Sequence, residues 1–328
     1  MKTLILIIEY FLIILPVLIG IAYMTLVERE ILGSIQRRKG PNVVGVSGFL
    51  QPLADGLKLM LKEIIIPSNA NTFLFILAPI ITFVGTMMYW AILPFSKGIS
   101  YTDLNLGALF IYAISALSIY GTIISGWASN TKYTFIGSIR SAAQMISYEL
   151  SIGVVFACIF LCTGSLNLTK IVLAQKYIWF CVPLFPLFII FLIALLAECN
   201  RHPFDLPEAE GELVAGYNTE YTAMGFALFF CGEYGNILVM STLISILFCG
   251  GWLPLFNLTF IPGIFWLCLK ICFFMSFYVI VRGAFVRFRY DQLMHIGWNS
   301  ILPISLGCFI FLAGILISFN ILPNTLCF

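Results

Sequence analysis

Charged residues are scarce in this chain: they form 10% of its 328 residues, whereas soluble domains carry about 25%. Hydrophobic residues form 61%, and the mean hydropathy is +1.04. The net charge is only +2 and no basic tract alternates with aromatic residues, which argues against nucleic-acid binding. No Gly/Ser/Pro-rich or charged linker divides the sequence. We therefore expect a single integral membrane domain over residues 1–328.

Patterns that bind metals or cofactors are also missing from the sequence. His202 and His295 are its only histidines, which argues against bis-histidine haem ligation. The ten cysteines form no C-x-x-C, so zinc and iron–sulfur sites are not predicted. No P-loop, Rossmann glycine pattern or hydrolase triad stands out. We therefore expect no catalytic residue and no metal site in this chain, and any electrons to be carried elsewhere.

Long apolar runs dominate what is present. A run of about 20 helical residues crosses the roughly 30 Å of hydrocarbon in a membrane. The alternation typical of a membrane β-barrel is absent. The predicted fold class is therefore all-α, a polytopic membrane protein with eight transmembrane helices, the first of them too long for a signal sequence. The predicted spans are residues 4–27, 73–93, 107–127, 145–166, 178–197, 222–248, 261–281 and 301–322.

The basic residues favour one orientation of these spans. Of the 17 lysines and arginines, 12 lie in four predicted loops on the same side, and only 4 lie in the termini and the opposite loops. This excess predicts that the four loops face the cytosol or matrix and that both termini lie on the other side. The four loops are residues 28–72, 128–144, 198–221 and 282–300.

The first of these loops contains a predicted amphipathic helix, Leu50–Lys62. Its apolar residues form one stripe, so we expect it to lie at the membrane interface. The preceding basic turn, Arg37–Asn42, is equally consistent with a simple membrane anchor. In the last loop, Arg282, Arg287 and Arg289 alternate with aromatic residues. They suit another subunit, a lipid headgroup or a polar quinone ring, with ordinary anchoring as the alternative.

The segment 198–221 is the most unusual part of the chain. It places six carboxylates around Arg201, between two predicted spans. Carboxylates this close repel each other and are costly near hydrocarbon, so holding or moving protons is the simplest function for them. A solvated acidic loop is the alternative, although apolar residues such as Phe204 and Leu206 predict that the segment folds back onto protein. The carboxylates are Glu198, Asp205, Glu208, Glu210, Glu212 and Glu220.

Apart from Glu9, near the end of the first span, three charged residues lie within the predicted spans: Glu149, Glu233 and Lys270. Each costs about 2.5–3.5 kcal/mol in hydrocarbon, so each should face protein or water. A buried ion pair, with Lys270 joined to Glu149 or Glu233, is one interpretation. A buried proton-conducting path is the other.

Five strings of the sequence together resemble a known family. The resemblance is to the quinone-site membrane subunit of proton-pumping NADH:quinone oxidoreductase, respiratory complex I, which is subunit 1 of the mitochondrial enzyme and has a counterpart in the bacterial one. The strings are LVERxILGxxQRRKGPNVVG at 26–45, LQPLADGLKLMLKE at 50–63, GSIRSAAQMISYE at 137–149, ECNRHPFDLPEAEGELVAGYNTEY at 198–221 and FRYDQLM at 288–294.

The resemblance implies a subunit of a proton-translocating NADH:ubiquinone reductase, with ubiquinone as the substrate. Flavin and iron–sulfur clusters would lie only in partner subunits. Expected partners are the redox-arm subunits at the quinone site (the terminal iron–sulfur cluster and 49-kDa-type subunits), neighbouring membrane-arm subunits and lipids. The wording of the motifs favours the mitochondrial inner membrane over a bacterial plasma membrane.

The same resemblance assigns roles to two sets of residues. The quinone chamber, its entrance or its subunit contacts would be formed by Glu28, Arg29, Arg37, Arg38, Asp55, Arg282, Arg287 and Arg289. The proton path would be formed by Glu149, Glu198, Asp205, Glu208, Glu210, Glu212, Glu220 and Glu233, with Tyr234 as a polar link.

Four positions depart from the family pattern: Glu30, His202, Val286 and Asn299. They affect loop geometry and local charge. Two other functions remain open at this point. One is the related membrane subunit of a membrane-bound hydrogenase, which nickel–iron centres in place of flavin would identify. The other is a self-contained transporter, against which the missing internal repeat argues.

Overall fold

The computed structural model describes residues 2–206, 214–254 and 260–320. Within them, apart from one isolated bridge between Ser96 and Ile99, the regular structure is helical. Among these described residues, seven helices are long and apolar enough to cross a membrane. They are α1 (Lys2–Ile35), α3 (Thr72–Tyr89), α4 (Gly107–Ala128), α5 (Lys132–Thr163), α9 (Ala223–Phe248), α10 (Gly263–Ala284) and the continuous run of α11 (Tyr290–His295), η4 (Ile296–Ile301, a π-helical turn) and α12 (Leu302–Ser318).

The remaining predicted span, residues 178–197, corresponds to a shorter apolar helix, α7 (Phe185–Glu198). Its 14 residues make a rod of about 21 Å, less than the hydrocarbon thickness. In the part of the chain that the structure describes, the other elements are α2 (Gln51–Leu61), α6 (Leu168–Ala174) and the 3-10 turns η1 (Val46–Gly48) and η2 (Gly216–Asn218). The all-α membrane fold predicted from the sequence is confirmed.

Several predicted boundaries were wrong, because helices continue beyond their apolar runs. α5 begins at Lys132, so the predicted loop 128–144 is a short turn between α4 and α5. α1 continues to Ile35, which puts Glu28 and Arg29 on a helix. The last helical run begins at Tyr290 instead of 301. Hydropathy reports which residues tolerate hydrocarbon, whereas a helix persists while its backbone hydrogen bonds are satisfied.

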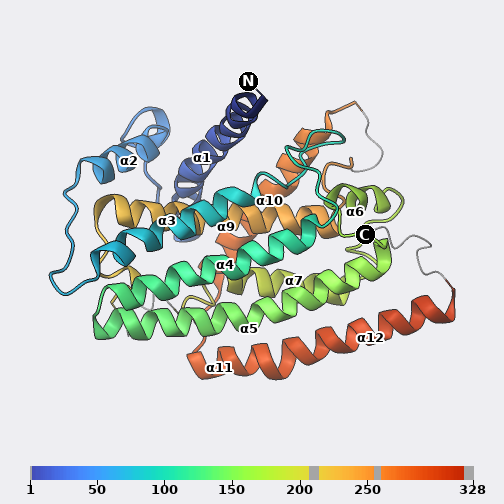
Figure 1. The fold of residues 1–328 in the computed structure, drawn as a ribbon. Coiled ribbons are helices and arrows are strands. Elements are labelled where there is room, and N and C mark those ends of the chain that lie inside the picture. Colours follow the sequence, from blue (N-terminus) through green and yellow to red (C-terminus); the bar gives the residue numbers. More distant parts are fainter. Residues whose placement is uncertain (1, 207–213, 255–259, 321–328) are drawn as a thin grey trace.

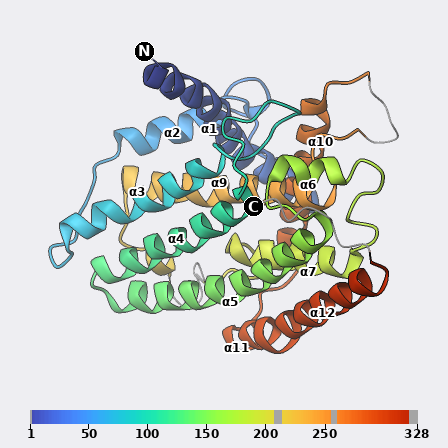
Figure 2. The same cartoon turned by 45° about the vertical axis from the view of Figure 1, so that its right-hand side comes forward.

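The helices form a bundle in which α3, α4 and α5 run side by side (Figure 1). α12 packs along the outer side of α5, as both views show (Figures 1 and 2). α9 packs on α3 and on α1 and α10. Nearly the whole C-terminal half of α9 is buried, so this helix forms the centre of the core.

Loops distant in sequence meet at one end of the bundle, here called the charged end. The amide of Asn71 donates to the Ala128 carbonyl at 3.0 Å, and the amide of Ile65 to Thr222 Oγ1 at 3.0 Å. The amide of Phe288 donates to the Pro203 carbonyl at 3.2 Å. The basic loops around residues 28–72, 198–221 and 282–300 therefore share one end, as the charge distribution predicts.

The acidic segment 198–221 is pressed against α5 at a glycine contact. A Cβ added to Gly137 of α5 would lie 2.9 Å from Gly216 Cα in η2, closer than real Cβ atoms come. Phe204 and Leu206 of the same segment are buried. In its described residues, the segment thus folds back onto protein as predicted, and η2 has a fixed position over α5.

The predicted amphipathic helix is present as α2, with Pro52 in its first turn. Leu53, Leu57 and Met60 form its apolar stripe and are largely exposed in the isolated chain. An apolar stripe that does not face the bundle is consistent with a helix lying at the membrane interface.

Candidate functional site

Glu28 is the centre of the buried polar site. This α1 residue is 5% exposed, and one carboxylate oxygen accepts a 2.5 Å hydrogen bond from the Tyr234 hydroxyl of α9. It forms an ion pair with Arg282 of α10 and lies 3.6 Å from Arg201 Nη1. The Arg201 guanidinium lies 4.3 Å from the centre of the Tyr234 ring. Two arginines and a hydroxyl thus compensate the charge of one buried carboxylate. The four groups come from four separate parts of the chain and meet only in the tertiary structure.

A second ion pair lies beside this centre. Arg287 Nη2 is 3.5 Å from Asp205 Oδ2, and Asp205 is buried. Burial raises the pKa of the Asp205 carboxyl, an effect that Arg287 and Arg201 oppose. Burial lowers the pKa of the His202 imidazole, and the charges of Arg287 and Arg282 lower it further. Both groups lie in the acidic segment, outside the spans, where their protonation responds to the neighbouring arginines.

Glu233 of α9 accepts a 2.5 Å hydrogen bond from the Tyr217 hydroxyl of η2. Both side chains line a small cavity of about 30 Å³, and Glu198 at the end of α7 lines it too. That volume holds about one or two water molecules. The other polar side chains lining it are Thr82, Thr86, Ser118, Thr122, Asn200 and Asn236. Glu198 and Glu233 therefore border the same polar space.

Glu149 continues this group of acids along α5. Its carboxylate accepts a 3.0 Å hydrogen bond from Ser115 Oγ of α4, and it is 8% exposed. Glu198 is 2% exposed, lies close enough for its charge to interact with that of Glu149, and has no partner for Oε2 among the described residues. The sequence predicted that Glu149 faces protein or water rather than lipid, and in the structure it faces protein.

Gln144 fixes the end of α7 that carries Glu198. Its Nε2 donates to the carbonyls of Ala197 and Phe204 at 2.8 and 2.7 Å and to Asn200 Oδ1 at 3.2 Å. Sequence reasoning missed Gln144, Ser115 and Tyr217. Gln144 and Tyr217 lie inside strings that carry the family resemblance, which was the available signal, whereas Ser115 gave none.

A larger cavity of about 390 Å³ opens between α1, α2 and α9. Its lining is mostly apolar and includes Phe83 and Phe230. Its polar edge is the exposed ion pair of Arg29 Nη1 and Asp55 Oδ2, which are 2.9 Å apart. Gln51 Nε2 holds the other Asp55 oxygen at 3.1 Å. An apolar wall with a few polar groups suits a flat, largely apolar ligand.

Some predicted site residues stand apart from this group. Arg37, Arg38 and Arg289 are exposed, and Arg38 Nε donates to Gln36 Oε1 at 2.7 Å. Glu220 is half-buried. Glu208, Glu210 and Glu212 lie outside the described residues.

The predicted pairing of Lys270 with Glu149 or Glu233 was wrong. Its Nζ donates to the carbonyls of Cys249, Gly251 and Leu253 at 2.7, 2.7 and 2.8 Å. It also lies 4.4 Å from the centre of the Trp179 ring. The chain leaves its helical path after Phe248, so carbonyls there lack helical donors, and Lys270 supplies them.

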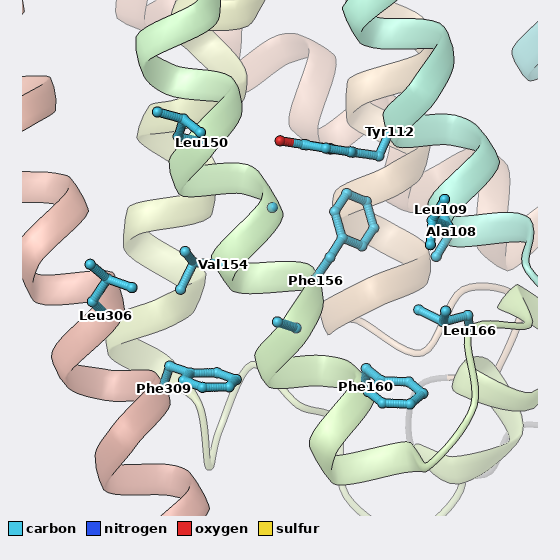
Figure 3. Close-up of a pocket in the computed structure, with 12 residues that line it drawn as sticks. Ala108, Leu109, Tyr112, Leu150, Val154, Phe156, Phe160, Leu166, Leu306 and Phe309 are labelled. Atoms are coloured by element: carbon cyan, nitrogen blue, oxygen red, sulfur yellow. The ribbon is translucent and has the colours of Figure 1, made fainter. Parts of the chain in front are cut away.

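An apolar cavity of about 490 Å³ lies between α4, α5 and α12 (Figure 3). Tyr112 carries its one side-chain polar atom, and the oxygen points from α4 toward α5. A Cβ added to Gly153 would lie 3.1 Å from that oxygen. Tyr112 is one helical turn before Ser115, so this cavity borders the Glu149 site without sharing its polarity.

Comparison with known proteins places the chain in a family. A family model described as NADH dehydrogenase matches residues 8–313. NADH–ubiquinone oxidoreductase chain 1 of Chondrus crispus is 58% identical over 321 residues, which cover 97% of this chain and 98% of that protein. The corresponding chain 1 of Arabidopsis thaliana is 55% identical over 314 residues, covering 95% and 97%. A bacterial NADH–quinone oxidoreductase subunit, from Paramagnetospirillum magneticum, is 54% identical over 325 residues, covering 98% and 95%. With buried acids, an apolar cavity and near full-length similarity all present, the chain belongs to the NADH dehydrogenase family that includes these mitochondrial and bacterial oxidoreductase subunits.

Proposed function

We propose that the chain forms the membrane part of the ubiquinone chamber in an NADH:ubiquinone oxidoreductase and links quinone reduction to proton translocation. Electrons would arrive from flavin and iron–sulfur clusters in partner subunits. The mitochondrial inner membrane is the proposed location, with the charged end facing the matrix and contacting the redox arm. The relatives' names, the basic residues at that end and the buried acids support this proposal.

The single observation that carries the proposal is the set of contacts at Glu28. Glu28 lies one residue before Arg29, which lines the 390 Å³ cavity. Through Tyr234 it is joined to α9, the helix that carries Glu233. One buried carboxylate thus connects the residues assigned to the chamber with those assigned to the proton path.

This arrangement suggests how the chain's residues act. Reduction of a quinone to a hydroquinone takes up two protons and changes the charge near the chamber. Arg201 and Arg282 respond to that change because both neutralise Glu28. A shift of positive charge toward or away from Glu28 alters the field at the acids beyond it. Buried acids in mutual contact titrate together, so such a shift redistributes their protons.

Glu149→Gln, Glu210→Gln and Glu233→Gln test the proposal in the assembled complex. Each keeps the size of the side chain and removes its titratable proton. Quinone-linked turnover and proton pumping should fall together by about tenfold or more, since proton-transfer groups contribute about 10²–10⁴-fold. Electron transfer from NADH to artificial flavin-level acceptors should stay near normal.

Glu9→Gln is the matched control. Glu9 is exposed on α1, and the same chemical change there should leave pumping unaltered. If all three test variants assemble and pump at the wild-type rate, the acids are docking or structural residues and the proton-path function is wrong.

A further inference from the structure

We infer that Tyr217 is a positioning residue for Glu233: its hydroxyl holds the Glu233 carboxyl group against the polar cavity shared with Glu198. The inference rests on the proposed function and adds to it a residue of the acidic segment that is not itself an acid. It assigns to η2 the task of fixing the geometry of proton exchange between α7 and α9.

The contact is short and partly buried. The Tyr217 oxygen lies 2.5 Å from Glu233 Oε1, and Tyr217 is 2% exposed. Hydrogen bonds from a hydroxyl to a carboxylate have lengths of about 2.5–2.7 Å and are roughly twice as strong as neutral ones. A phenol that donates to Glu233 therefore favours one orientation of the carboxyl group.

Tyr217 has little freedom to move. Its ring packs edge-on against Phe229 of α9, with centroids 5.4 Å apart. Its neighbour Gly216 lies against Gly137 of α5, where there is no space for a Cβ. The ring is thus held between α5 and α9, and its hydroxyl is preorganised before any proton moves.

The position of this contact gives it a role in proton exchange. Tyr217, Glu233 and Glu198 all line the 30 Å³ cavity, which can hold about one or two waters. A proton passes from a neutral Glu198 to a water, and a proton passes from that water to the Glu233 carboxylate. Glu198 becomes a carboxylate as Glu233 becomes neutral, so the total charge is unchanged. Tyr217 keeps its own proton throughout. By fixing one carboxylate oxygen, it prevents Glu233 from rotating away from the cavity.

Tyr217→Phe in the assembled complex tests this role. The change removes one hydroxyl and keeps the ring packed on Phe229. Quinone-linked turnover should fall several-fold, while electron transfer to flavin-level acceptors stays normal. The infrared difference spectrum between oxidised and reduced complex should show a shifted carboxyl band for Glu233. Comparison with Glu233→Gln identifies that band.

Tyr221→Phe is the matched control. Tyr221 belongs to the same segment and packs edge-on against the same Phe229, with centroids 4.9 Å apart. Its hydroxyl has no hydrogen-bond partner among the described residues. Loss of this hydroxyl should therefore change neither turnover nor the Glu233 band.

Glu233→Asp provides a second test if Tyr217→Phe fails to assemble. It keeps the acid but withdraws it from the tyrosine by one methylene, and the same loss of turnover is expected. Wild-type turnover and an unmoved Glu233 band in Tyr217→Phe, or wild-type turnover in Glu233→Asp, would overturn the inference. If Glu233→Gln still lowers pumping in that case, the proposed function stands. Wild-type pumping in Glu149→Gln, Glu210→Gln and Glu233→Gln would remove both.

Discussion

Two polar sites of different construction lie at opposite ends of α9. Beyond its C-terminal end, Lys270 donates its three protons to three backbone carbonyls. Beside it, Gln175 Nε2 donates to the carbonyls of Ile246 and Leu247, and Gln175 Oε1 accepts from the Gly250 amide. Lys270 therefore has its full set of hydrogen bonds, and its partners are neutral groups that cannot change protonation.

The N-terminal half of α9 faces several carboxyl groups instead. Glu233 and Tyr234 bind Tyr217 and Glu28. Nearby, Glu198 and Asp205 each have one carboxylate oxygen without a hydrogen-bond partner among the described residues. Two arginines, Arg201 and Arg282, share the carboxylate of Glu28.

The difference shows why burial of a charge alone does not indicate function. A single ammonium group that donates all its hydrogen bonds to backbone carbonyls holds two segments together, and it has no neighbouring group with which to exchange a proton. Several carboxyls that share cations and hydroxyls have alternative proton distributions of similar free energy. Such a group can respond to a distant change of charge, so the proton path is expected on the N-terminal half of α9 and a structural tie beyond its C-terminal end.

The largest expected effect is from Lys270→Met. It leaves three backbone carbonyls without their donor, and each buried acceptor left unsatisfied costs about 1–3 kcal/mol. We expect little assembled complex and a strongly lowered thermal midpoint, measured by native gel and by thermal unfolding in detergent. Lys97→Met, at an exposed lysine, is the control. Normal assembly with lost pumping would contradict the comparison, because Lys270 would then be functional rather than structural.

Arg29→Ala should have an intermediate effect that is kinetic in nature. The Arg29–Asp55 pair is exposed, so its loss should cost at most about 1 kcal/mol of stability. Its position at the edge of the 390 Å³ cavity predicts a several-fold higher apparent KM for quinone. Steady-state kinetics with a water-soluble quinone measure this. Unchanged quinone kinetics after substitution of Arg29 and of Asp55 would exclude this cavity as the entrance.

The smallest expected effect is from His202→Asn. The folded pKa of His202 is lowered by burial and by Arg287 and Arg282, so below pH 6.5 the unfolded chain binds more protons than the folded one. Wild-type stability should therefore fall as the pH falls from 6.5 toward the folded pKa. The His202→Asn variant should lack this part of the dependence of stability on pH.

Thermal midpoints measured one unit above and one unit below pH 6.5 test this expectation. Asp205 contributes with the opposite sign, since its raised pKa favours the folded state as the pH falls. That contribution is present in both proteins and cancels in their difference. Identical slopes for the two proteins would mean that His202 is protonated equally in both states.

Sequence reasoning succeeded where a property depends on neighbouring residues. The apolar runs predicted the membrane helices, and the pattern of Leu50–Lys62 predicted α2. It failed at the boundaries of long helices, such as the first residue of α5, because polar and charged residues can extend a helix beyond the hydrocarbon. It also failed for the partners of Lys270, because backbone carbonyls freed at a helix end are invisible in a pattern of side chains.

The sequence by itself therefore determined the environment of this protein: a membrane bundle with its basic loops at one end and its acids concentrated in one segment. Only the tertiary structure decided which charges meet. Glu28 and Tyr234 are 206 residues apart, and Glu28 and Arg282 are 254 apart. The hydrophobicity of a segment follows from its residue types alone, so the sequence of that segment is enough to predict whether it is buried in the membrane. A hydrogen bond depends on distance and direction, which are set only when α1, α9 and α10 pack together.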